Sequence, residues 1–234
     1  MKHLRLICFA TCLVLLCSCQ SNIDPFTSKG GDNTIGFYCD GQKYIQLYKT
    51  LPFGSAHKSV YAWREDDDIL IFSYVIRKAY DSRDYVIQAL GFCIPGHRKY
   101  EKGDIIHLSG DELMVICWRK RSDNDSSANE ADDAWENYER LSPASQRQYL
   151  FPVNATIRVK QYNSSVLSCD FEIEGDLKKQ EGDEAVQLKK GACNVIINGS
   201  GSNNTDIPKA RDDYHKLHEL YCEYIEQTHS SPAQ

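Results

Sequence analysis

The sequence lacks the motifs by which common enzyme classes are recognised. It contains no G-x-S-x-G nucleophile turn, no phosphate-binding P-loop and no dinucleotide-binding glycine fingerprint. The glycine-rich stretch Asn198-Gly199-Ser200-Gly201 is not followed directly by a helical pattern, so it indicates a linker. We therefore assign no catalytic residue and no cofactor, and we expect a protein that is not an enzyme.

The sequence also lacks an excess of positive charge. Of its 27 Lys and Arg residues, Lys2 and Arg5 lie in a predicted signal segment, which leaves 25 against 33 Asp and Glu residues and a net charge of −8. Such an acidic chain is a poor ligand for nucleic acid and for an anionic membrane surface. We expect no nucleic-acid partner.

A long apolar run is missing as well. The apolar stretch at residues 6–16 is too short to cross a bilayer as a helix. It follows the basic residues Lys2 and Arg5 and precedes the small residue Ser18, which is the anatomy of a secretory signal peptide. The pattern therefore predicts an exported protein.

The stretch Leu16-Cys17-Ser18-Cys19 is typical of a bacterial lipobox, with Leu three residues and Ser one residue before the cysteine. It predicts a lipoprotein signal peptide at residues 1–18 and lipidation of Cys19 by several acyl chains, such as palmitate. Two or more chains give stable anchoring. The alternative is an ordinary signal peptide with incidental cysteines. Gln20 is not the Asp of inner-membrane retention, so we expect the outer membrane. Residues 19–33 read as a flexible tether.

Cysteine pairs with metal-binding spacing are absent from the predicted mature chain. Besides Cys19 it holds Cys39, Cys93, Cys117, Cys169, Cys193 and Cys222, none of them in a C-x-x-C pair. This argues against a zinc ribbon and a thioredoxin-like motif. An even number in an exported protein permits disulfides, and the spacing leaves both the pairing and the choice between disulfides and thiols open.

The remaining pattern predicts a mainly β domain at residues 34–197. Asp40-Gly41 between apolar runs is a strong hairpin signal. Residues 69–77 are apolar on both faces, which predicts a central or covered strand beside residues 84–94. Residues 152–162, 166–174 and 192–197 predict a three-stranded meander, the first two from their alternation. We expect one antiparallel sandwich or barrel of roughly eight to ten strands.

Three further segments are predicted around this domain. Residues 122–142 are acidic and indicate a surface insertion, with one short helix at 131–141. Residues 198–205 read as a linker. Residues 206–227 have helical periodicity, and their apolar stripe consists of Tyr214, Leu217, Tyr221, Tyr224 and Ile225.

The predicted helix carries the most suggestive ligand set. His218 and Cys222 are spaced i, i+4, Glu219 adjoins His218, and His215 lies one turn earlier, as in a variant of a zinc-protease motif. Solvated side chains on an amphipathic helix explain the same pattern, and we predict no metal site. The acidic run at residues 65–68 lacks the alternation and glycine of a calcium loop, so it reads as a solvated turn.

Aromatic residues offer a second kind of candidate. The sequence has 14 tyrosines and 3 tryptophans, which could stack on a glycan or contact a peptide. The candidates near predicted turns are Tyr61, Trp63, Tyr80 and Tyr85. The alternative is that these rings fill strand cores.

With the lipobox, two further motifs resemble a group of uncharacterised Bacteroidetes lipoproteins, a domain-of-unknown-function family. The opening Asn33-Thr34-Ile35-Gly36-Phe37-Tyr38-Cys39-Asp40-Gly41-Gln42-Lys43-Tyr44 is similar to its N-T-x-G…[ND]-G-K opening. The closing stretch at residues 168–191 is similar to its C-terminal meander, although Cys169 and Asp170 replace the usual Gly and Thr. The resemblance implies a β-rich envelope domain and no active site.

These observations lead to one functional expectation and two alternatives. We expect a non-enzymatic, lipid-anchored protein of the cell envelope that binds a glycan, a peptide or an envelope protein. One alternative is a metal-assisted hydrolase built on the C-terminal helix. The other is a purely structural accessory of a larger envelope assembly.

Overall fold

The computed structural model describes residues 24–28, 33–39, 41–46, 49–50, 56–57, 60–74, 76–78, 85–96, 98–109, 114–118, 138–147, 150, 154–174, 188–197 and 206–230. Cys19 lies outside them. No helix within these ranges is both long enough and apolar enough to cross a membrane.

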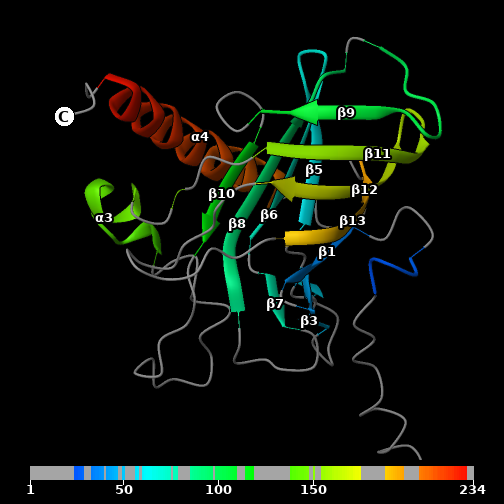
Figure 1. Ribbon diagram of the computed structural model, residues 1–234, viewed down its shortest axis with the longest axis horizontal. Helices are drawn as coiled ribbons and strands as arrows, with labels where there is room; N and C mark the ends of the chain where they lie inside the picture. Colours follow the sequence, from blue (N-terminus) through cyan, green and yellow to red (C-terminus); the bar gives the residue numbers. More distant parts are fainter. Residues whose placement is uncertain are drawn as a thin grey trace, which may run out of the picture.

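The described chain is mainly β and ends in one long helix (Figure 1). Its strands are β1 (Thr34–Cys39), β2 (Gln42–Gln46), β3 (Lys49–Thr50), β4 (Ala56–His57), β5 (Val60–Glu65), β6 (Asp68–Ser73), β7 (Ile76–Lys78), β8 (Tyr85–Ile94), β9 (Ile105–Leu108), β10 (Met114–Trp118), β11 (Asn154–Tyr162), β12 (Val166–Glu174) and β13 (Leu188–Ile196). The helices are α3 (Pro143–Arg147) and α4 (Asp206–Ser230).

Eleven strands form one antiparallel sheet in the order β5-β6-β8-β7-β2-β1-β13-β12-β11-β9, with β10 paired to β8. A separate pair, β3 and β4, completes the described strands. This exceeds the predicted eight to ten strands because pairings of two or three residues, such as β3 with β4, leave no periodic signal. The path is open from β5 to β9.

The large sheet folds over so that its two halves face each other. In Figure 1 the meander strands β11, β12 and β13 run across β6 and β8. Phe92 of β8 packs against Phe171 of β12, with ring centroids 5.2 Å apart. Both rings belong to one core that includes residues of both halves. The arrangement is therefore sandwich-like, which confirms the predicted fold class.

The meander follows its alternating sequence. β12 pairs with β11 and with β13 in antiparallel register, so that Phe171 faces Ile157 on one side and Gly191 on the other. The apolar positions of β12 are buried at alternate residues, Ser168 is buried as well, and the half-exposed Asp170 forms an ion pair with Lys160 at 3.1 Å. The hairpin prediction is also confirmed, because Cys39 pairs with Gln42 across a turn that contains Gly41 at φ 73°.

β6 is covered on both faces, as its sequence predicts. Ile69 and Ile71 enter the core inside the sandwich, which we call the first core. Leu70 and Phe72 point the other way, into a second core under α4. β8 is its neighbour in the sheet. The apolar run on both faces of this strand is therefore what attaches α4 to the sheet.

Besides β6, which ends at Ser73, and β13, which begins at Leu188, two segments differ from the predicted boundaries. Residues 24–28 fall inside the predicted tether, yet they form a turn on the domain, where Pro25 is buried and its carbonyl accepts a 2.8 Å hydrogen bond from Asn194 Nδ2. An ion pair joins Asp24 to Lys43. α4 extends to Ser230, beyond the predicted end at residue 227. The linker at 198–205 lies outside the described residues.

Candidate functional site

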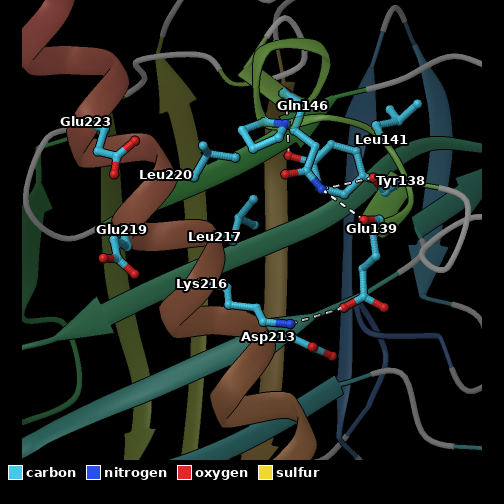
Figure 2. A pocket seen from close by; sticks show the side chains of 11 residues that line it. Tyr138, Glu139, Leu141, Gln146, Asp213, Lys216, Leu217, Glu219, Leu220 and Glu223 are labelled. Atoms are coloured by element: carbon cyan, nitrogen blue, oxygen red, sulfur yellow. Dashed lines mark hydrogen bonds and ion pairs between the residues drawn. The ribbon is translucent and has the colours of Figure 1, made fainter.

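A groove lies between α4 and the segment 138–147 (Figure 2). Its volume is about 510 Å³. Its apolar lining comes from Tyr138, Leu141, Pro143, Leu217 and Leu220, and its polar lining from Glu139, Gln146, Asp213, Lys216, Glu219 and Glu223. A mixed lining of this kind is typical of a small-ligand site, since the apolar part supplies contact area and the polar part orientation.

One wall of the groove is α4, and its orientation follows from its sequence. Ala210, Tyr214, Leu217 and Tyr221 recur at helical spacing and are buried in the second core. The neighbouring positions Asp213, Lys216 and Leu220 therefore point along the flank of the helix, toward the segment 138–147 (Figure 2).

The opposite wall is held by hydrogen bonds within the segment 138–147. The Gln146 side-chain amide donates to the carbonyl of Tyr138 at 3.0 Å, while the Tyr138 ring is 2% exposed in the second core. Ser142 caps α3 by accepting from the Ser145 amide at 3.3 Å. An ion pair between Arg147 and Glu223 connects this wall to α4.

Asp213 is the most buried charged group of the groove. Its side chain is 4% exposed. The Tyr74 hydroxyl donates to it at 2.7 Å, and Lys209 Nζ, one helical turn earlier, lies 3.5 Å away. Burial and then the Asp213 carboxylate raise the pKa of Tyr74, so this hydroxyl keeps its proton and remains a donor.

Glu139 faces Asp213 from the other wall. Burial, followed by the negative charge of Asp213, raises the pKa of Glu139 above its ordinary value. The charge of Lys209, and then that of Lys216, whose Nζ is 4.0 Å from Glu139 and whose side chain is 75% exposed, offset this repulsion only in part. The two carboxylates therefore form a site where a further positive charge is favourable.

The predicted metal ligands of α4 have separate partners. His215 Nε2 lies 2.9 Å from Glu65 at the end of β5. His218 stacks on Tyr214 and its Nδ1 lies 3.8 Å from Cys222 Sγ. Among the residues that the structure describes, no three His, Cys, Asp or Glu side chains are grouped to hold a metal ion.

The acidic run at residues 65–68 forms the turn between β5 and β6. Asp66 and Asp67 are exposed, whereas Asp68 accepts a 3.0 Å hydrogen bond from the Gly96 amide. Burial alone would raise the pKa of Glu65, but hydrogen bonds from Trp63 and His215 outweigh it and lower that pKa. The carboxylate of Asp68 thus stabilises the turn and that of Glu65 contacts α4. The predicted turn is confirmed.

The aromatic candidates divide differently from the prediction. Trp63 is 1% and Tyr61 8% exposed, because both rings lie in the second core beneath α4. Of the two alternatives for these rings, the structure therefore supports core filling and not a ligand surface at Tyr61 and Trp63. Tyr80 and the side chain of Tyr85 lie outside the described residues.

Sequence reasoning did not find the groove. In the sequence, Asp213 lies in the predicted helix at 206–227, and Tyr138 lies in the predicted short helix at 131–141. Neither pattern reveals that the two segments meet, because about seventy residues separate them in the sequence. The signal in the sequence that could have indicated the groove is Asp213, a carboxylate directly before Tyr214 at the edge of the apolar stripe of the helix.

Comparisons with known proteins add no family. No protein-family model matches the chain, and no curated protein matches it. Among solved structures, the chain is compared with the tesB protein of Mycobacterium avium subspecies paratuberculosis at 9% identity, over 71% of this chain and 80% of that one. The TM-score is 0.14, so this comparison carries no argument about fold or function.

Proposed function

We propose that the protein is a lipid-anchored, non-enzymatic binding protein of the cell envelope, and that the groove beside α4 binds a segment of peptide with a basic side chain. The lipobox that ends at Cys19 supports the anchor, and Gln20, which stands where Asp would favour inner-membrane retention, leaves the outer membrane open as the location. The observation that carries the binding proposal is the pair Asp213 and Glu139, two neighbouring carboxylates in a groove that is lined in part by apolar side chains.

The chemistry of the groove favours a basic peptide over a neutral glycan. An ammonium or guanidinium group would pair with both carboxylates and would offset the repulsion that raises the pKa of Glu139. The methylene stem of Lys or Arg would pack on Leu217 and Leu220. The lining carries four carboxylates, Glu139, Asp213, Glu219 and Glu223, and one lysine, Lys216, while Lys209 and Arg147 pair with Asp213 and Glu223 from beside the lining. A neutral sugar would satisfy neither the charge nor the apolar floor.

Calorimetric titration with the blocked tripeptides acetyl-Leu-Lys-Leu-amide and acetyl-Leu-Glu-Leu-amide tests this proposal. We expect the lysine peptide to bind and the glutamate peptide to bind at least about tenfold more weakly, since one charge-assisted contact contributes about 1.5–3 kcal/mol. Glu139→Gln should weaken lysine-peptide binding by about tenfold on the same grounds.

The matched control is Glu172→Gln, which removes an exposed carboxylate on β12, a strand that contributes no residue to the groove. Its affinity for the lysine peptide should equal that of the wild type. Equal binding of both peptides, no binding of either, or an unchanged affinity in Glu139→Gln would each refute the proposed site.

A further inference from the structure

Two cysteines face each other inside the meander. Cys169 of β12 and Cys193 of β13 are direct cross-strand partners. Their side chains are hydrogen-bonded to each other, and both are free thiols in the structure. They are 2% and 1% exposed and belong to the first core. The register of the two strands, rather than a local sequence motif, therefore brings them together.

The backbone geometry of such a pair suits a covalent link. Directly opposed residues of an antiparallel pair have Cα atoms about 4.5 or 5.5 Å apart, according to their place in the hydrogen-bond ladder. Disulfides span Cα separations of about 4.4–6.8 Å. The Cβ atoms of cross-strand partners, about 4.5–5.5 Å apart, need approach by only about 1 Å. A bond between the two sulfurs therefore requires no change of register.

The other described cysteines are placed differently. Cys93 contacts Asp68, with sulfur and oxygen 3.7 Å apart, and burial raises its pKa to about 12. Cys222 contacts His218. Cys169 and Cys193 are the pair of thiols that contact each other among the described side chains.

We propose that Cys169 and Cys193 are joined by a disulfide bond in the exported protein. The proposal rests on the envelope location proposed above, because export brings the chain into a compartment where disulfides form. The two thiols lose two protons and two electrons as the S–S bond forms. A thiol–disulfide oxidoreductase of the envelope accepts them, and its own disulfide becomes a dithiol.

The burial of both thiols determines when the disulfide forms during folding. The hydrogen bond to Cys169, together with burial, holds the pKa of Cys193 above its ordinary value, and both cysteines are buried, so an oxidoreductase has no access to the pair in the folded core. Thiol–disulfide exchange with the oxidoreductase therefore takes place before the first core forms during folding. The bond then links β12 to β13 and closes the chain between them. Reduction should lower the thermal midpoint by about 5–10 °C, given the loop length.

Peptide mapping of the wild-type chain tests the bond without any substitution. The full chain is expressed with its own signal, recovered from the bacterial envelope, alkylated without reduction and digested with trypsin. Cleavage after lysine places Cys169 in peptide 161–178 and Cys193 in peptide 191–209, each with a single cysteine. We expect the two peptides as one cross-linked species that separates on reduction. The variant with Cys93→Ser and Cys222→Ser should give the same species.

Two separately alkylated peptides from the envelope sample, or a link from Cys169 to another cysteine, would overturn the proposal. Geometry is tested apart from location by refolding the full chain from urea in a buffer of glutathione and glutathione disulfide. The same cross-linked species is expected there, and its absence would contradict the inference even if the chain is neither anchored nor exported. If the chain is retained in the envelope and both thiols are found alkylated, the proposed disulfide is refuted and the proposed function is not.

Discussion

Gly91 of β8 sets how closely α4 can approach the sheet. A Cβ atom at this position would lie 2.8 Å from Cε2 and 3.0 Å from Cδ2 of Tyr214. The Tyr214 ring is 3% exposed and meets Trp63 and Phe72 edge-on, each with centroids 5.9 Å apart. Because these neighbours leave the ring no space to retreat, Gly91→Ala should displace α4 by a few tenths of an ångström.

The size of the effect follows from two opposing contributions. Overpacking a tight core costs about 1–3 kcal/mol of unfolding free energy. Replacing a strand glycine by alanine raises the free energy of unfolding by about 0.5–1 kcal/mol, since alanine loses less backbone entropy on folding. We expect a net loss of about 1–2 kcal/mol, or about 2–8 °C in the thermal midpoint. Urea unfolding followed by tryptophan fluorescence should give a lower midpoint at an unchanged slope.

The matched control is Gly191→Ala. Its Cβ would lie 2.2–2.4 Å from three ring atoms of Phe171, in the first core, on the side of the sheet away from α4. Both variants should lose stability, but only Gly91→Ala should also weaken binding of the lysine peptide, because Asp213 and Leu217 move with α4. Tyr214→Leu added to Gly91→Ala should recover part of the stability. A fully stable Gly91→Ala variant, or equal loss of binding in both, would refute this reasoning.

Three further predictions concern α4 and its partners. Tyr74→Phe removes the donor to buried Asp213 and should lower the unfolding free energy by about 1–3 kcal/mol in urea titrations; an unchanged midpoint would contradict the contact. Because folding raises the pKa of Glu139, this residue adds to the free energy of unfolding at acid pH, and that addition is lost as the pH rises through the pKa of the folded state. Glu139→Gln should therefore gain stability relative to wild type between pH 4 and pH 7, and an equal difference at both values would refute the shift. Zinc should move the thermal midpoint of wild type and of the His218→Ala, Cys222→Ala variant alike, within about 1 °C, since two ligands leave a tetrahedral site incomplete; a larger shift in wild type alone would reveal a site.

The parts of the fold that could be predicted are those with a strong local pattern. The Asp40-Gly41 turn, the alternation of residues 154–174 and the two-faced apolar run of β6 each reflect one backbone period or one turn conformation. The helical stripe of α4 is of the same kind. These patterns fixed the fold class and the place of the helix.

The remainder depends on contacts between distant segments. In the sequence, Trp63 and Tyr61 lie near a predicted turn, and such a position is compatible with a surface and with a core. Only the packing of α4 makes them core residues. The groove needs the meeting of Glu139 with Asp213, and the thiol pair needs the register of β12 and β13. No local period encodes such pairings. Residues 24–28 likewise join the domain through distant partners, Asn194 and Lys43.

The mass of the N-terminal tryptic peptide tests the central claim, anchorage at the envelope through Cys19, most directly. Protein recovered from bacterial membranes should yield peptide 19–29, which begins at Cys19, ends at Lys29 and carries the added mass of several acyl chains. Cys17→Ala should leave this peptide unchanged, and Cys19→Ala should abolish it. A mature chain that begins elsewhere, or an unmodified Cys19 thiol, would contradict the account.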